Sequence, residues 1–172
     1  PQRNVGLLIL IVALIILGIS VFSTIIHLNS VEMWLIGLMS LSAGGYLLFD
    51  AFAVSIWNNS NIANTRMLGL CMMFYMLFGT MLIVTLLKNT AKKVALIATI
   101  VSGISILACI SLSIFEKIPF FDTWLGWAVI EILIGIILMV CVIISIHGAT
   151  PVKRNLYITS LVFLVSFPVD VI

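Results

Sequence analysis

The fold is decided by stretches such as residues 5–26, VGLLILIVALIILGISVFSTII, which contain no charged side chain. A helix rises about 1.5 Å per residue, so about 20 apolar residues cross the roughly 30 Å hydrocarbon core of a bilayer. This stretch is therefore long enough to span a membrane. No A-x-A-like cleavage site follows it, so we expect a permanent span rather than a cleavable signal peptide.

The rest of the chain repeats this pattern. Apolar residue types make up 63% of it, charged residues only 8%, and the mean hydropathy is +1.37. Soluble domains are about 45–50% apolar and about 25% charged, so this composition excludes a water-soluble globule. We predict six spans, joined by short polar connections, at residues 5–26, 31–57, 67–87, 94–115, 124–146 and 156–172.

These spans favour helices over strands. In lipid only helices and closed barrels satisfy all backbone groups, and barrel strands alternate between apolar and polar residues over about 10 positions. The runs here are apolar on every face. We therefore predict an all-α, polytopic transmembrane bundle that forms a single domain over residues 1–172. The sixth run is shorter than the others, contains Asp170 and ends without a polar tail.

Glycines recur at matching places in the spans and indicate three tandem helical hairpins. In the odd-numbered spans, Gly18, Gly79 and Gly135 are each followed nine to twelve residues later by His27, Lys88 or His147. The first two hairpins carry a further glycine in their second span, where the third has Ser166-Phe167-Pro168. Small residues let membrane helices approach closely. We therefore predict helix-packing roles for Gly18, Gly44, Gly79, Gly103 and Gly135.

The motifs Leu17-Gly18-Ile19, Ser102-Gly103-Ile104 and Ile134-Gly135-Ile136 resemble signatures of the HdeD-like acid-resistance membrane proteins. That resemblance covers most of the chain. It implies a small six-helix membrane protein built from tandem hairpins, without an assigned enzymatic step.

A second resemblance points to a different class. His27-Leu28-Asn29-Ser30-Val31 is similar to the first loop of the J-type (mitochondrial subunit 6) membrane chain of respiratory complex I. Tyr75, Glu131 and His147 also have similar counterparts there. This resemblance implies a subunit of a proton-translocating assembly.

Three ionisable residues lie inside predicted spans: Asp50, Glu131 and Asp170. Charged groups in the membrane interior are costly and are functional candidates. Each is placed in the same half of the bilayer, with Asp50 and Glu131 about 10 Å from the boundary. One hypothesis is an acidic cluster that binds a proton, a cation or the hydroxyl group of a ligand. The alternatives are separate carboxyl groups bonded to neighbouring Ser or Thr residues, or side chains that extend back to the interface.

The distribution of basic residues sets the predicted orientation. One face carries Lys88, Lys92, Lys93, Lys153 and Arg154, and the opposite face only Arg3, Arg66 and Lys117. By the positive-inside rule the first face is cytoplasmic, which places both termini on the extracytoplasmic side. Trp57, Trp124 and Trp127 fall at the predicted extracytoplasmic boundary, where we expect an interfacial aromatic belt.

The sequence offers no pattern typical of an enzyme or of a nucleic-acid-binding protein. The net charge is only +2, and no P-loop, GxSxG, HExxH or metal-ligand spacing is present. We expect no catalytic activity, no cofactor and no metal, and we interpret Cys71, Cys109 and Cys141 as small buried hydrophobes.

The expected partners are the lipid bilayer and other membrane-protein subunits, not nucleic acid. The leading interpretation is a structural or accessory subunit of a membrane assembly. The alternative is a proton- or cation-translocating subunit that uses the intramembrane carboxyl groups.

Overall fold

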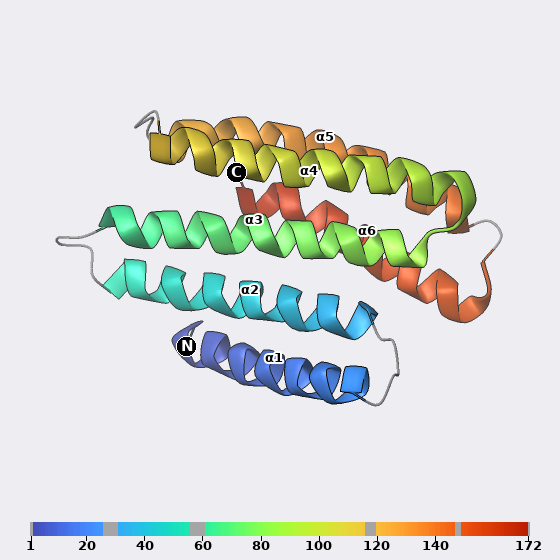
Figure 1. Ribbon diagram of the computed structural model, residues 1–172, viewed down its shortest axis with the longest axis horizontal. Coiled ribbons are helices and arrows are strands. Elements are labelled where there is room, and N and C mark those ends of the chain that lie inside the picture. Colours follow the sequence, from blue (N-terminus) through green and yellow to red (C-terminus); the bar gives the residue numbers. More distant parts are fainter. Residues whose placement is uncertain (1, 26–30, 56–60, 116–119, 147–148, 172) are drawn as a thin grey trace. The chain divides into compact units, whose positions relative to one another are not determined.

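A computed structural model describes residues 2–25, 31–55, 61–115, 120–146 and 149–171. It contains six helices and no strand within these ranges, which confirms the all-α prediction (Figure 1). The helices are α1 (Gln2–Ile25), α2 (Val31–Ser55), α3 (Asn61–Leu86), α4 (Asn89–Phe115), α5 (Phe120–Ile146) and α6 (Pro151–Val171).

Five of these helices are long and apolar enough to cross a membrane, so the chain is an integral membrane protein. Their apolar segments are Asn4–Thr24, Val31–Leu48, Met67–Leu86, Asn89–Leu112 and Thr123–Ile146. The predicted sixth span corresponds to α6, whose described residues are not among the five.

Five helices begin earlier than the predicted spans: α1 and α5 by three or four residues, and α3, α4 and α6 by five or six. α3 begins at Asn61 rather than 67, α4 at Asn89 rather than 94, and α6 at Pro151 rather than 156. Hydropathy identifies only the part of a helix that lies in hydrocarbon. The backbone hydrogen bonds continue beyond that part, so polar residues assigned to connections belong to helix ends.

The chain divides into two compact units, Pro1–Leu82 and Ile83–Ile172, and the division falls inside α3. The first unit therefore contains α1, α2 and most of α3. The second contains the last turn of α3 together with α4, α5 and α6. The assignment of the whole chain to one domain stays a prediction.

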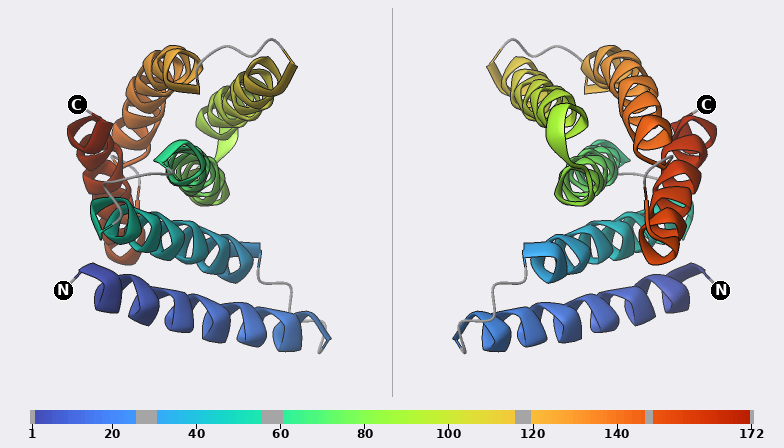
Figure 2. Two further views of the ribbon diagram at one scale, coloured as in Figure 1. Left: turned by 90° about the vertical axis from the view of Figure 1, so that its left-hand side faces the viewer. Right: turned by 90° about the vertical axis from the view of Figure 1, so that its right-hand side faces the viewer.

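In the first unit α1 lies along α2 through small residues (Figure 2). Within the described side chains of α1, only Gly6, Ala13 and Ser20 are buried, and they recur every seven residues. A Cβ added at Gly44 of α2 would lie 2.8 Å from Leu10 Cγ and 3.0 Å from the Leu10 backbone nitrogen. The two backbones thus approach too closely for a side chain at this point.

The opposite end of this helix pair is held by a polar contact. The Trp34 indole nitrogen of α2 donates a hydrogen bond to Thr24 Oγ1 of α1, at 3.0 Å. Thr24 Oγ1 also donates to the Ser20 carbonyl one turn earlier, at 2.8 Å. The first hairpin therefore combines close backbone packing with one interhelical hydrogen bond near its turn.

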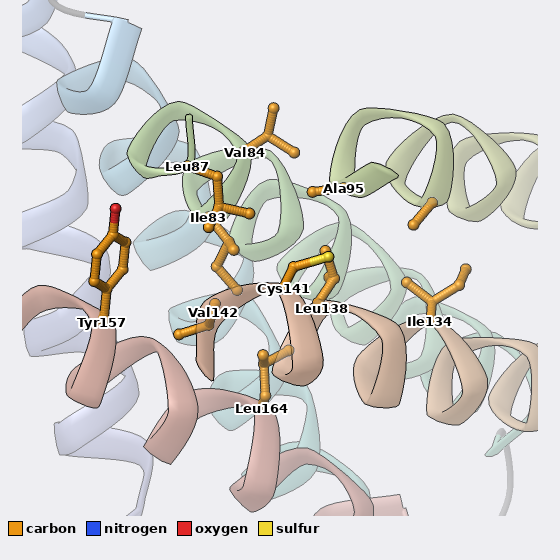
Figure 3. Packing of buried hydrophobic residues seen from close by; sticks show 11 residues of the cluster. Ile83, Val84, Leu87, Ala95, Ile134, Leu138, Cys141, Val142, Tyr157 and Leu164 are labelled. Carbon is orange, nitrogen blue, oxygen red and sulfur yellow. The ribbon is translucent and has the colours of Figure 1, made fainter. Parts of the chain in front are cut away.

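The second unit is built on a larger apolar cluster, in which α5 contacts both α4 and α6 (Figure 3). Four helices supply its side chains: Ile83, Val84 and Leu87 at the end of α3; Ala95 and Ala98 of α4; Ile134, Leu138, Cys141 and Val142 of α5; Tyr157 and Leu164 of α6. Cys109 and Cys141 are buried, as predicted, whereas Cys71 of α3 is only half-buried.

A tight turn joins α3 to α4 through Leu87 and Lys88. Asn89 has a φ of 53°, in the left-handed region that Asn tolerates better than most residues. This conformation reverses the chain within two residues. Across the turn, the Tyr157 hydroxyl of α6 donates a hydrogen bond to the Leu86 carbonyl at 3.0 Å. This bond satisfies one of the final carbonyls of α3, which lack an intrahelical donor.

Candidate functional site

The strongest candidate site is a buried polar pair between α4 and α5. Glu131 of α5 and Ser102 of α4 are both completely inaccessible to solvent. The Ser102 hydroxyl donates a hydrogen bond to Glu131 Oε1 at 2.5 Å. Because the neighbouring residues along both helices are apolar, this bond is a specific contact that fixes the two helices against each other.

The second oxygen of the Glu131 carboxyl group, Oε2, has a different environment. Glu131 Oε2 is buried and has no hydrogen-bond partner among the described residues. The indole of Trp127, one turn earlier on α5, interacts with the same carboxyl group and is 2% exposed. A buried oxygen without a partner is costly in a low-dielectric interior. Binding of a proton or a cation at Glu131 Oε2 would therefore relieve this cost.

A groove of about 400 Å³ lies next to this pair, between the second half of α4 and the first half of α5. Its walls include Ser105 and Cys109 of α4, and Thr123, Gly126 and Trp127 of α5. Trp127 thus contributes both to the groove and to the surroundings of Glu131. This arrangement differs from the interfacial position predicted for Trp127, because its ring packs between helices beside a carboxyl group.

The predicted acidic cluster is only partly described. Glu131 is placed as above, whereas Asp50 lies in α2 and Asp170 in α6, with side chains outside the described residues. Asp50 also belongs to the first unit and the other two acids to the second. The cluster stays a hypothesis, and the one carboxyl group that is described is bonded to a serine. His27 and His147 lie outside the described residues.

The predicted packing glycines fall into different environments. Gly44 is in close contact with α1, as described above. A Cβ at Gly18 or Gly135 would meet no atom within 4 Å, so neither shows close packing among the described residues. Gly79 is buried and Gly103 half-buried.

Sequence reasoning missed several residues that carry the packing. Gly6, Ala13 and Ser20 form the buried stripe of α1, and a Cβ at Gly37 of α2 would lie 2.8 Å from Leu17 Cδ2. A heptad repeat of small residues was the available signal. A comparison of glycines between hairpins does not reveal this repeat, because its members are three different residue types along one helix. Ser102 was named as part of a motif, not as the partner of Glu131.

No group of three or more His, Cys, Asp or Glu side chains able to hold a metal ion occurs among the described residues. The comparisons with protein-family models, characterised proteins and solved structures find no match to this chain. The two family resemblances inferred from short motifs therefore stay predictions.

Proposed function

We propose that this chain is a non-enzymatic, multi-pass membrane protein that acts as a structural or accessory subunit of a larger membrane assembly. One observation carries the proposal. Gly18 lies on the exposed face of α1, and a Cβ there would meet nothing within 4 Å. Glycine inside a helix costs about 1 kcal/mol relative to alanine, and close packing against a partner helix offsets such a cost.

The rest of α1 supports the same role. Leu14 and Ile15 are 61% and 56% exposed, so the outer face of the helix is apolar with a small residue within it. Lipid tails are as apolar as leucine, and helix association in membranes depends on small residues and polar contacts instead. The internal packing of α1 uses Gly6, Ala13 and Ser20, which leaves Gly18 available to a helix of another subunit.

Co-purification in mild detergent tests this role. The Gly18→Leu variant should lose polypeptides that co-purify with the wild type at fixed stoichiometry, because the added side chain keeps a partner helix away. The matched control is Val12→Phe, which adds bulk at another exposed position about 120° around α1. A solitary monomer with an activity of its own, or equal losses in both variants, would contradict the proposal.

A second candidate function is proton or cation translocation, and a specific observation favours it. Glu131 combines complete burial, a serine bond on one oxygen and no partner on the other, beside a groove. In liposomes, a pH-dependent flux that is lost in Glu131→Gln, and in the Asp50→Asn and Asp170→Asn variants, would support it. Flux that is absent, or unchanged in Glu131→Gln, would exclude this function.

We also propose that the face with Lys88, Lys92, Lys93, Lys153 and Arg154 is cytoplasmic, and that both termini are extracytoplasmic. The support is the excess of basic residues on that face. Lys93 is exposed, so a Lys93→Cys variant should react with a membrane-impermeant maleimide only after the cells are opened. Labelling of Lys93→Cys in intact cells would instead show that this face is extracytoplasmic.

A further inference from the structure

One end of the second unit carries a polar groove with two lysines. The groove has a volume of about 440 Å³ and lies among the first turns of α4 and α6 and the last turn of α5. Lys88 and Lys153 both line it, and both also line an adjoining hollow of about 130 Å³. Two lysines far apart in the sequence therefore face one shared space.

The two ammonium groups have no acidic neighbour in this space. The Lys88 side chain lowers the pKa of Lys153, first through direct contact between the two side chains, in which the charged Lys153 finds no acceptor, and then through repulsion between like charges. Among the described residues, no acidic side chain lines the groove or the hollow. Glu131, the acid of this unit whose side chain is described, lies 13 positions from Ile144 along α5, which is about 20 Å. An anion between the lysines would relieve their repulsion.

The backbone around the groove also favours an anion. The first intrahelical bonds join the Lys92 amide to the Lys88 carbonyl in α4 and the Arg154 amide to the Thr150 carbonyl in α6. The amides just before them, at residues 89–91 and 152–153, lack intrahelical acceptors. The positive ends of two helix dipoles thus lie at this end of the unit.

Two of the carbonyls that would oppose an anion are already occupied. The Leu86 carbonyl at the end of α3 accepts the Tyr157 hydroxyl at 3.0 Å. The Ile146 carbonyl at the end of α5 accepts the Ala149 amide at 3.1 Å. The groove therefore presents mainly positive groups and hydroxyl groups, including those of Thr90 and Thr150.

The depth of the groove identifies the source of the anion. The apolar segment of α4 begins at Asn89 and that of α5 ends at Ile146, so the groove lies at one end of both segments, where we expect hydrocarbon to meet the lipid headgroups. Ile144 lines the groove and Leu156 the hollow, and both are largely exposed, so they offer an apolar surface beside the charges. A molecule with a phosphate group and an acyl chain matches both features.

We propose that this groove binds the phosphate group of an anionic phospholipid, with Lys88 and Lys153 as its charged contacts and Thr90 and Thr150 as hydroxyl donors. Basic pockets between membrane helices are known to bind anionic headgroups. This inference does not depend on the proposed assembly role, since it concerns the second unit and a lipid rather than α1 and a protein partner.

The test compares two double variants of the full chain that remove the same charge. Lys88→Gln/Lys153→Gln removes both groove lysines, whereas Lys92→Gln/Lys93→Gln removes two exposed lysines that line neither hollow. Binding is measured as retention of phosphatidylglycerol against phosphatidylcholine by native mass spectrometry, after exchange from mixed vesicles. All four lysines are exposed, so both variants should fold, which circular dichroism and gel filtration check.

The wild type should retain phosphatidylglycerol in preference to phosphatidylcholine. The groove variant should lose that preference by about tenfold or more, and the control variant by about twofold or less. Equal losses in both variants would overturn the site, because they indicate diffuse surface attraction. Equal retention of the two lipids by the wild type would also overturn it. Displacement of the lipid by inorganic phosphate, but not by chloride at matched ionic strength, would overturn the assignment to a lipid and indicate a free phosphate.

Discussion

The helix pairs α1–α2 and α4–α5 differ in the contact that holds their central parts together, although a hydrogen bond from Trp34 to Thr24 also joins the first pair near its turn. In the first, small residues bring the backbones together, and the contact at Gly44 excludes even a methyl group. In the second, an interhelical hydrogen bond joins Ser102 to Glu131 inside the bundle. In lipid, apolar contact between helices contributes little to the free energy of their association. Each pair therefore depends on close backbone packing, on an interhelical hydrogen bond, or on both. A contact that depends on close approach should be weakened most by a larger side chain. A polar contact should be weakened most by a substitution that removes the hydrogen-bonding group.

The largest effect should come from added volume at Gly44. In Gly44→Ala the new Cβ would lie 2.8 Å from Leu10 Cγ and 3.0 Å from the Leu10 backbone nitrogen, so the helices must separate. We expect a loss of about 1–3 kcal/mol in the free energy of unfolding, measured by thermal denaturation in detergent.

The matched control for Gly44 is Gly18→Ala, where the new Cβ meets nothing. Because alanine is the better helix former, this variant should be neutral or more stable by up to about 1 kcal/mol. A similar loss of stability in both variants would show that the α1–α2 pair does not depend on close approach at Gly44.

The next effect concerns the polar contacts of the second unit. Tyr157→Phe removes the hydroxyl that donates to the Leu86 carbonyl. We expect a loss of about 0.5–1.5 kcal/mol in the free energy of unfolding, because the partly buried carbonyl loses its donor.

Thr159→Val is the matched control for Tyr157. The Thr159 hydroxyl is exposed and donates to the Asn155 carbonyl within the same helix, at 3.0 Å. Its removal should change stability by less than about 0.5 kcal/mol. If the two variants lose the same amount, the bond between α6 and the end of α3 contributes nothing specific.

The Ser102–Glu131 contact should have a smaller but measurable coupling energy. A double-mutant cycle with Ser102→Ala and Glu131→Met isolates the pair. Cycles between membrane helices average about 0.6 kcal/mol and reach about 1.7, so we expect a coupling in that range. Ser105→Ala removes a hydroxyl that donates to the Ser102 carbonyl of its own helix, and should show no coupling to Glu131. A coupling energy near zero between Ser102 and Glu131 would show that their hydrogen bond does not hold α4 and α5 together.

The smallest effect is electrostatic and lies outside the membrane. The pKa of Lys153 is lowered by Lys88, so Lys88→Gln should raise the pKa of Lys153 toward its ordinary value, as NMR of isotope-labelled lysine can measure. The pKa of Lys153 is lower in the folded chain than in the unfolded chain. At a pH between these two pKa values the unfolded chain binds more protons than the folded chain, so the free energy of unfolding rises as the pH rises through this range. This rise in the free energy of unfolding should be slight, since Lys153 is exposed. It should be absent in the Lys88→Gln variant. An unchanged pKa in the variant would show that the two ammonium groups do not interact.

The sequence alone was sufficient to predict the membrane helices. Long uncharged runs, such as residues 5–26, leave a helix as the conformation that satisfies every backbone group in lipid. The same reasoning identified Glu131 as an unusual residue, because its charge is out of place in an apolar run. Helix ends such as Asn61–Arg66 were missed, because polarity marks the limit of the hydrocarbon rather than the limit of the helix.

Only the tertiary structure decided which residues meet. Apolar runs look alike on every face, so hydropathy does not separate the buried stripe of Gly6, Ala13 and Ser20 from the open face of Gly18. Likewise, Ser102 and Lys88 gain their significance from partners on other helices, Glu131 and Lys153. The physical reason is that hydropathy depends on one residue at a time, whereas close approach, hydrogen bonding and charge repulsion depend on distances between residues far apart in the chain.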